Sequence, residues 1–143
     1  MEYNEENLER VSEIIRECLT SDLLPKRMNE VWQKRAMISP MFGHCHTASA
    51  CLRKIFGKEN IQLYRGLDDD EIYHWWAEDK NGVLIDITAE QYTNAGLTPP
   101  YDRGEKASPL GFPSYRDKIN TVMERVEAKL NNKEASLFGE KNA

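Results

Sequence analysis

The sequence predicts a single α+β domain in which helices pack on a small antiparallel sheet. Apolar residues recur at helical spacing near both ends of the chain, whereas the middle holds three short segments rich in β-branched and aromatic residues. Polar turns separate these segments, and no linker divides the chain. With 143 residues, the chain is long enough to bury one core. We place the domain at residues 1–131 and a polar C-terminal tail at residues 132–143.

Two helices are predicted in the first third of the chain. The first covers roughly residues 5–20, and its apolar stripe consists of Leu8, Val11, Ile14, Ile15, Cys18 and Leu19. The second is capped by Ser21-Asp22 and runs through Met28, Val31 and Trp32. Pro25 suits its first turn, where a backbone N–H is not needed.

Two further helices flank the strand region. One spans roughly residues 45–56 and stops at Gly57, a residue typical of helix ends. Residues 93–113 are rich in Pro and Gly and predict a long irregular loop, a kind of segment that is often functional. The last helix covers residues 114–131, with Ile119, Val122, Met123, Val126 and Leu130 as its stripe.

Three strands are predicted at residues 61–65, 72–77 and 83–88, and the second and third carry His74 and Asp86. Side chains alternate between the faces of a strand, so the loop between these strands decides whether the two residues can meet. A two-residue turn puts them on opposite faces, and a five-residue loop puts them directly opposite each other. A three-residue loop, Lys80-Asn81-Gly82, makes them diagonal neighbours on one face and needs Gly82 in the left-handed conformation.

Composition excludes several classes of function. The formal net charge of -5 provides no electrostatic footprint for nucleic acid or an anionic membrane. No apolar run approaches the roughly 18 residues of a membrane span, and the N-terminus is too polar for a signal peptide. Three cysteines at irregular spacing argue against a disulfide scaffold, so we expect a cytoplasmic protein.

The segment Gly43-His44-Cys45-His46-Thr47 carries the clearest chemical signal. It places Cys45 in the first turn of a helix, where unpaired backbone N–H groups and the helix dipole favour negative charge. A thiol at such a position is biased toward the nucleophilic thiolate. His74 and Asp86 follow on strands, and this Cys, His, Asp order is the one that papain-like thiol enzymes use.

Each residue of this set has an expected role. Cys45 attacks a carbonyl carbon, His74 moves the proton, and Asp86 fixes the His74 tautomer. The Cys45 backbone N–H is one oxyanion donor. The sequence does not identify the second oxyanion donor, for which His44 and the upstream Gln33 are candidates. Trp76 is a candidate for the wall of the site.

The remaining polar and thiol groups have structural interpretations. Cys18 and Cys51 fall on apolar helix faces and are expected to be buried hydrophobes. We interpret His46 as a surface or capping residue. The run Asp68-Asp69-Asp70-Glu71 lacks the spaced ligands of a calcium site and predicts a solvated turn. The basic cluster Lys26, Arg27, Lys34 and Arg35 is interpreted as a solvated helix face.

The stretch Ser39-Pro40-Met41-Phe42-Gly43-His44-Cys45 resembles the nucleophile segment of the YunG-like family. The resemblance continues through Phe56-Gly57, His74-Trp75-Trp76, Asn81-Gly82, Ile85-Asp86-Ile87-Thr88-x-x-Gln91-Tyr92 and Ser114-Tyr115-Arg116, and spans roughly residues 30–130. It implies a papain-like or transglutaminase-like fold and a Cys45, His74, Asp86 triad. This chain departs from the family pattern at His44, where the family usually has Gln.

The sequence thus predicts a cysteine hydrolase or acyltransferase that needs no cofactor and no metal. It acts on an amide, isopeptide or thioester bond, for which a protein or peptide is one candidate substrate. A non-catalytic protein-binding module with the same fold is the main alternative. A zinc site made from His44, Cys45, His46, Cys51 and His74 is a further alternative, although the spacing of these residues matches no common ligand pattern.

Overall fold

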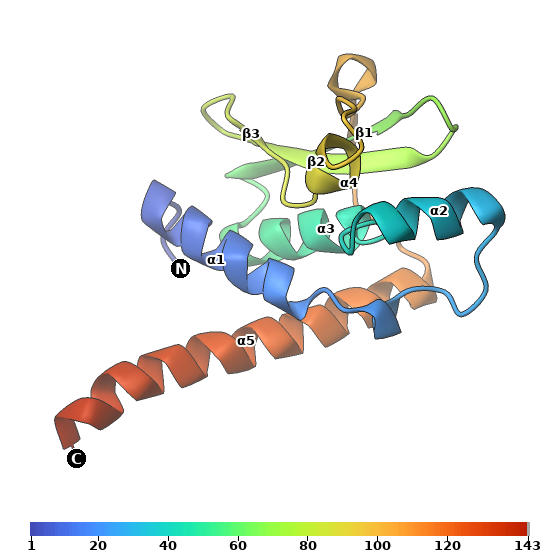
Figure 1. The fold of residues 1–143 in the computed structure, drawn as a ribbon. Coiled ribbons are helices and arrows are strands. Elements are labelled where there is room, and N and C mark those ends of the chain that lie inside the picture. The colour runs from blue at the N-terminus through green and yellow to red at the C-terminus, as the bar shows by residue number, and fades with distance from the viewer. Residues whose placement is uncertain (143) are drawn as a thin grey trace.

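The computed structural model describes the backbone of residues 1–142 and the side chains of residues 1–132. Figure 1 shows an antiparallel sheet on one side of the molecule and helix α3 (Cys45–Phe56) beneath it. Helices α1 (Glu5–Cys18) and α5 (Pro113–Asn142) lie below α3. Because α3 packs against the sheet as well as against both helices, it forms the middle of the core. The predicted α+β architecture is confirmed.

The first and third helices match their predicted ranges closely. Asn4 caps α1 by accepting a hydrogen bond from the Asn7 backbone amide. The predicted apolar stripe is buried in the core, except for Leu8, which is partly buried. Helix α3 ends at Gly57, which has a φ of 90° that side chains rarely adopt. Cys18 and Cys51 are buried within the core, as expected.

The sheet has the strand order β3-β2-β1-β4. Strand β1 (Ile61–Leu67) pairs with β2 (Tyr73–Asp79), and β2 pairs with the short β3 (Leu84–Ile85). The Asp79 amide donates to the Val83 carbonyl at 2.9 Å, so the loop between β2 and β3 contains three residues. Gly82 has a φ of 81°. Of the loop lengths considered from the sequence, the structure has the three-residue loop with a left-handed Gly82, which puts residues 74 and 86 on one face.

The third strand is shorter than the predicted range of residues 83–88. The ladder stops after Ile85 because the chain then turns. In this turn the backbone N–H of Gln91 donates to the Thr88 carbonyl. This turn leads into the short helix α4 (Glu90–Thr93).

The second helix begins later than predicted. Residues Ser21–Leu23 form only a short 3₁₀ turn, η1, and helix α2 spans Glu30–Ile38. Pro25 disfavours the helical conformation of the preceding residue, and Leu24 is indeed extended with a ψ of 155°. The cap is Asn29, whose side chain accepts from the Trp32 amide at 2.9 Å.

The Pro- and Gly-rich segment at residues 93–113 is more ordered than predicted. It contains the 3₁₀ turn η2 (Tyr101–Arg103) and the edge strand β4 (Glu105–Ala107), which pairs with β1. Gly66 on β1 makes this docking feasible, because a Cβ there would lie 2.8 Å from the Pro100 carbonyl oxygen. The segment therefore completes the sheet and covers the face that carries Asp86.

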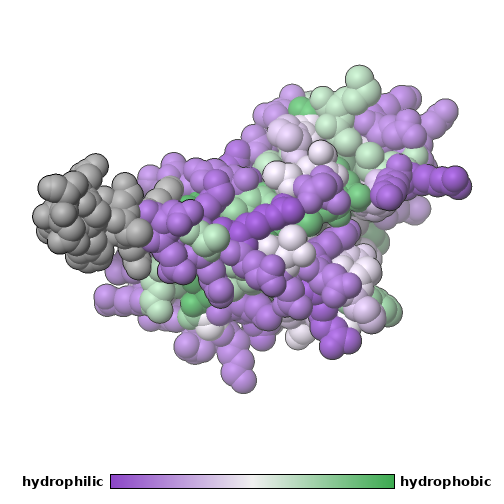
Figure 2. Space-filling model, turned by 90° about the horizontal axis from the view of Figure 1, so that it is seen from below, coloured by the Kyte–Doolittle hydropathy of each residue, from purple (hydrophilic) through white to green (hydrophobic). Residues whose placement is uncertain are grey.

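Helix α5 runs from Pro113 to Asn142, well beyond the predicted end at residue 131. Lys, Glu and Ala after residue 132 are good helix formers, and they allow the backbone to continue. Figure 2 views the molecule from below, and the described part of this face is largely hydrophilic. In the part of the chain that the structure describes, no helix combines the length and apolarity that a bilayer crossing requires.

Candidate active site

Cys45 is the first residue of α3 and follows a tight turn. Gly43 has a φ of 87° in this turn, and a Cβ at this position would collide with the Leu24 side chain. The first hydrogen bond of the helix joins the Ala48 amide to the His44 carbonyl, so the amides of residues 45–47 precede the helical ladder. Cys45 is 8% exposed, and its Sγ lies 3.9 Å from the Tyr73 carbonyl oxygen. The thiol is thus held where the helix favours an anion.

His74 lies on β2 next to Cys45 and is completely buried. Its Nε2 lies 2.6 Å from Asp86 Oδ2, a distance typical of a strong charge-assisted hydrogen bond. The ladder pairs Ala77 with Ile85, which makes residues 74 and 86 diagonal neighbours on one face of the sheet. The odd number of residues in the loop between β2 and β3 therefore brings the two side chains together.

When Cys45 is a thiolate, the electrostatics of His74 favour the charged ring. Burial by itself lowers its pKa, but hydrogen bonds to Asp86 and Cys45 and their negative charge outweigh burial and raise the pKa to about 9. The same interactions connect His74 to the thiol on one side and to the carboxylate on the other. Because Nε2 faces Asp86, the other ring nitrogen, Nδ1, faces the side-chain amide of Gln91, 3.2 Å away.

Two more donors hold the Asp86 carboxylate. The Tyr101 hydroxyl donates to Oδ2 at 2.7 Å, and the Thr88 amide donates to Oδ1 at 3.2 Å. Burial and the hydrogen bond to Asp86 raise the pKa of Tyr101 above its ordinary value, so it remains a donor. Sequence reasoning missed Tyr101, because its docking depends on the η2 turn.

Gln91 also belongs to this cluster and was not predicted as a site residue. It is 4% exposed, and its amide nitrogen lies 3.2 Å from His74 Nδ1 and 2.9 Å from the Thr88 hydroxyl. The ring of Tyr92, the next residue, meets the His74 ring edge-on, with the ring centroids 4.7 Å apart. The only signal in the sequence was the position of Gln91-Tyr92 shortly after Asp86.

A pocket of about 300 Å³ opens beside Cys45. Its walls are mainly aromatic, and Gln91, His46, Arg65 and Glu71 add polar groups. The Arg65 guanidinium lies over the Tyr73 ring, 4.5 Å from its centroid. The aromatic lining residues are Trp32, Phe42, Tyr73, Trp75 and Tyr115.

The structure corrects the interpretation of His46 as a surface residue. His46 is 6% exposed and lines the pocket, and its Nε2 accepts a hydrogen bond from the Leu110 amide at 2.9 Å. Trp75 and Tyr115 meet its ring edge-on from two sides. Burial and then the charge of Lys118 lower the pKa of His46 to about 4, which makes it a neutral part of the pocket wall.

The three residues predicted to bind the oxyanion or substrate lie apart from this pocket. His44 is the buried N-cap residue of α3, and burial lowers its pKa to about 4, with Lys118 as a weaker influence. Gln33 lies at the surface, where its amide donates to the Met28 carbonyl at 2.7 Å. Trp76 stacks on His74 and packs against Tyr101, whereas its neighbour Trp75 lines the pocket.

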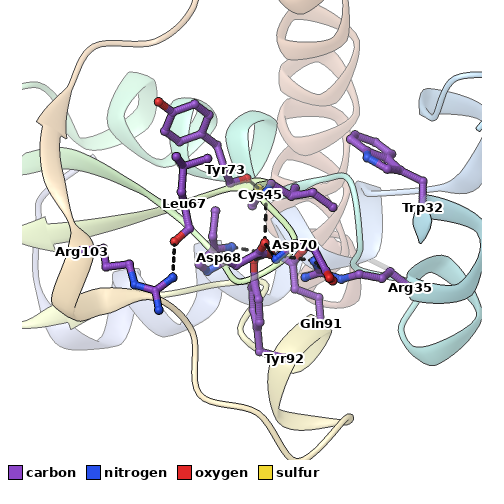
Figure 3. Close-up of polar contacts among 12 residues, drawn as sticks. Trp32, Arg35, Cys45, Leu67, Asp68, Asp70, Tyr73, Gln91, Tyr92 and Arg103 are labelled. Atoms are coloured by element: carbon purple, nitrogen blue, oxygen red, sulfur yellow. Dashed lines mark hydrogen bonds and ion pairs between the residues drawn. The ribbon is translucent and has the colours of Figure 1, made fainter. Parts of the chain in front are cut away.

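The acidic turn after β1 is not fully solvated, contrary to prediction. Figure 3 shows Asp68 between Arg35 and Tyr92, and its Oδ2 accepts from both, at 2.6 and 2.7 Å. Burial raises the pKa of Asp68, but the hydrogen bonds from Arg35, Tyr92 and the Ile72 amide outweigh it and lower the pKa. Arg35 is likewise largely covered rather than part of a solvated basic face, because its side chain is only 11% exposed.

The Arg35–Asp68 ion pair lies next to two aromatic residues of the Cys45 and His74 surroundings. The Arg35 guanidinium lies between the Phe42 and Tyr92 rings, 5.0 and 4.8 Å from their centroids. Phe42 precedes the turn that leads into Cys45, and Tyr92 packs on His74. The pair thus joins the segments that carry Cys45 and Gln91. Among the residues whose side chains the structure describes, no three His, Cys, Asp or Glu residues group so that they could hold a metal ion.

A family model described as YunG protein matches residues 7–131, which is most of the chain. The chain belongs to the YunG family. This match covers every residue of the cluster around His74 in this YunG-family protein. Comparisons with curated proteins and with solved structures gave no match.

Proposed function

We propose that this YunG-family protein is a cysteine-dependent acyl hydrolase or acyltransferase with a papain-like or transglutaminase-like arrangement of Cys45, His74 and Asp86. The observation that carries the proposal is the hydrogen bond of 2.6 Å between His74 and Asp86, next to a cysteine at the start of a helix. The pocket beside Cys45 provides room for a substrate. All three cysteines are free, which agrees with a reducing compartment such as the cytoplasm.

The first step transfers the Cys45 thiol proton to His74 Nδ1 and leaves a thiolate paired with the imidazolium. The sulfur attacks the carbonyl carbon of an amide, isopeptide or thioester, and the carbonyl electron pair moves onto oxygen. When the tetrahedral intermediate collapses, His74 gives its proton to the leaving amine or thiol and the acyl group stays on Cys45 as a thioester. Water or an acceptor amine then attacks the thioester, and His74 removes its proton.

Asp86 holds the imidazole and stabilises its charged form. Because His74 is completely buried, an unpaired imidazolium would be costly there, and the Asp86 carboxylate offsets that cost. The first oxyanion donor is the Cys45 backbone N–H, which the helix start leaves free of an intrahelical acceptor.

The pocket walls define the kind of acyl group that would bind. Aromatic rings offer a large apolar surface, so a substrate with an aromatic or bulky apolar group next to the scissile carbonyl suits them. Arg65 and Glu71 place one positive and one negative group among these rings. A peptide or peptide-like substrate carries both apolar side chains and such polar groups.

Acylation by p-nitrophenyl acetate, followed by intact-mass spectrometry and peptide mapping, tests the proposal. We expect one acetyl group on Cys45 that later hydrolyses, and no acetylation in Cys45→Ala. Cys18 and Cys51 are buried internal controls that stay unmodified. Equal labelling of wild type and Cys45→Ala would contradict the proposal.

A protein-binding module without turnover is the second candidate. Leu97 and Phe112, on the segments that flank η2 and β4, are 58% and 64% exposed and could form a contact surface. Absence of acylation together with slow alkylation of Cys45 would favour this function. Stoichiometric zinc in the purified protein would instead favour the metal site.

A further inference from the structure

The short segment from Asp86 to Gln91 contacts both ring nitrogens of His74. Asp86 binds Nε2 at 2.6 Å, and the Gln91 amide nitrogen lies 3.2 Å from Nδ1. Thr88 links the two ends, because its amide donates to Asp86 and its hydroxyl accepts from Gln91. One hexapeptide therefore holds the imidazole from both sides.

The segment is fixed from outside by α1. Arg16 donates to the Ile87 carbonyl at 2.8 Å and pairs with Glu90 at 2.6 Å. Gln91 itself is nearly fully buried, yet it is one of the residues that line the pocket beside Cys45. The side-chain amide of Gln91 is therefore already held between His74 and the pocket before a substrate binds. A fixed donor at such a position can stabilise negative charge that develops on the substrate.

An amide nitrogen has two N–H donors. One is used by the Thr88 hydroxyl, and the other can donate to Nδ1 only while Nδ1 carries a lone pair. When Nδ1 takes the thiol proton, it becomes a donor and no longer accepts from Gln91. The step that creates the thiolate therefore releases one N–H of the Gln91 amide.

We propose that Gln91 is the second oxyanion donor of this site, and that proton transfer from Cys45 to His74 frees its amide for that task. This inference rests on the proposed function. The released N–H donates to the carbonyl oxygen as negative charge develops on it, together with the Cys45 backbone N–H. When the intermediate collapses, His74 loses its proton to the leaving group and Nδ1 accepts from Gln91 again.

Two reagents separate this role from a merely structural one. Iodoacetamide alkylates the thiolate by displacement of iodide and forms no oxyanion, whereas p-nitrophenyl acetate must pass through one. We measure both rates at Cys45 for the wild type, for Gln91→Met, which keeps the volume, and for Gln91→Glu, which keeps the shape but replaces the amide nitrogen with oxygen. Gln62→Glu is the matched control, because the Gln62 amide bonds to the Leu63 carbonyl on β1, away from the pocket.

We expect both Gln91 variants to acylate about 100-fold more slowly, the loss typical of removing one oxyanion donor. Their alkylation rates should stay within about threefold of wild type, and Gln62→Glu should change neither rate. Equal losses with both reagents, or no loss with either, would overturn the assignment of Gln91 while leaving Cys45 as the nucleophile. A wild-type protein that is not acylated at Cys45 would overturn the proposed function and this inference together.

Discussion

His74 Nε2 and Asp86 Oδ2 lie 2.6 Å apart across two strands whose ladder contains only two residue pairs. A three-residue loop makes the two residues diagonal neighbours, and a loop one residue shorter would turn Asp86 to the other face. Three donors then fix the carboxylate, namely His74, Tyr101 and the Thr88 amide. The short hairpin is therefore sufficient to build the buried pair that the proposed chemistry uses.

Asp86→Asn should reduce the rate of Cys45 acylation by about 10² to 10⁴-fold, because an amide can bind the wrong His74 tautomer and does not stabilise the imidazolium. Substrate affinity should change much less, since Asp86 lies behind His74 rather than in the pocket lining. Pre-steady-state acylation over a range of ester concentrations separates the two effects. A loss confined to affinity would contradict the role of Asp86.

Tyr101→Phe should destabilise the fold by about 1–3 kcal/mol, because it removes a hydrogen bond to a buried carboxylate, and should slow acylation. The matched control is Tyr3→Phe, which removes a 2.6 Å hydrogen bond from Tyr3 to Asp79 at a distance from the site. Urea unfolding should show a loss in both variants, but only Tyr101→Phe should affect acylation. Equal acylation rates in the two variants would show that Tyr101 has no part in positioning Asp86.

Stability should depend on pH in opposite ways on the two sides of neutrality. His74 has a pKa raised to about 9, so its contribution is complete below about pH 6.5 and is lost as the pH rises through 9. His44 and His46 have pKa values lowered to about 4, so their contribution is complete above about pH 6.5 and is lost as the pH falls through 4.

The free energy of unfolding should therefore pass through a maximum near pH 6.5, as measured by urea titration between pH 4 and pH 9.5. His74→Gln should reduce the decline on the alkaline side, leaving the part that comes from the buried thiols of Cys18 and Cys51, and keep the decline on the acid side. An unchanged alkaline decline in this variant would mean that another group causes it.

Arg35→Met should cost about 3–5 kcal/mol, because it leaves the buried Asp68 carboxylate without its cation. Arg103→Met is the control, since Arg103 pairs with Asp69 at 2.8 Å and both side chains are largely exposed. That change should cost less than about 1 kcal/mol. Similar losses in the two variants, measured by urea unfolding, would contradict the structural importance of the Arg35–Asp68 pair.

The sequence predicts the parts of the fold that depend on local patterns. Gly57 and the apolar stripe fix α3, and the three-residue loop Lys80-Asn81-Gly82, one of the loops considered from the sequence, sets the register in which His74 meets Asp86. Each of these features is set by a few neighbouring residues. Local periodicity and turn chemistry are therefore enough to find them.

The missed features depend on contacts between distant segments. Strand β4 has three residues and no alternating pattern, so only its pairing with β1 reveals it. Among three adjacent aspartates, sequence alone gives no reason for Asp68 to be the buried one, because Arg35 and Tyr92 select it from other elements. His46 is buried because the segment around Leu110 covers the start of α3. Tyr101 and Gln91 join the site for the same kind of reason.

The pH dependence of Cys45 alkylation by iodoacetamide, compared between wild type and His74→Gln, tests the central claim most directly. We predict rapid and selective alkylation of wild-type Cys45 below pH 7, and in His74→Gln the behaviour of an ordinary thiol, whose rate rises only toward about pH 8.5. Identical pH profiles in the two proteins would contradict the account, because His74 would then have no part in generating the thiolate.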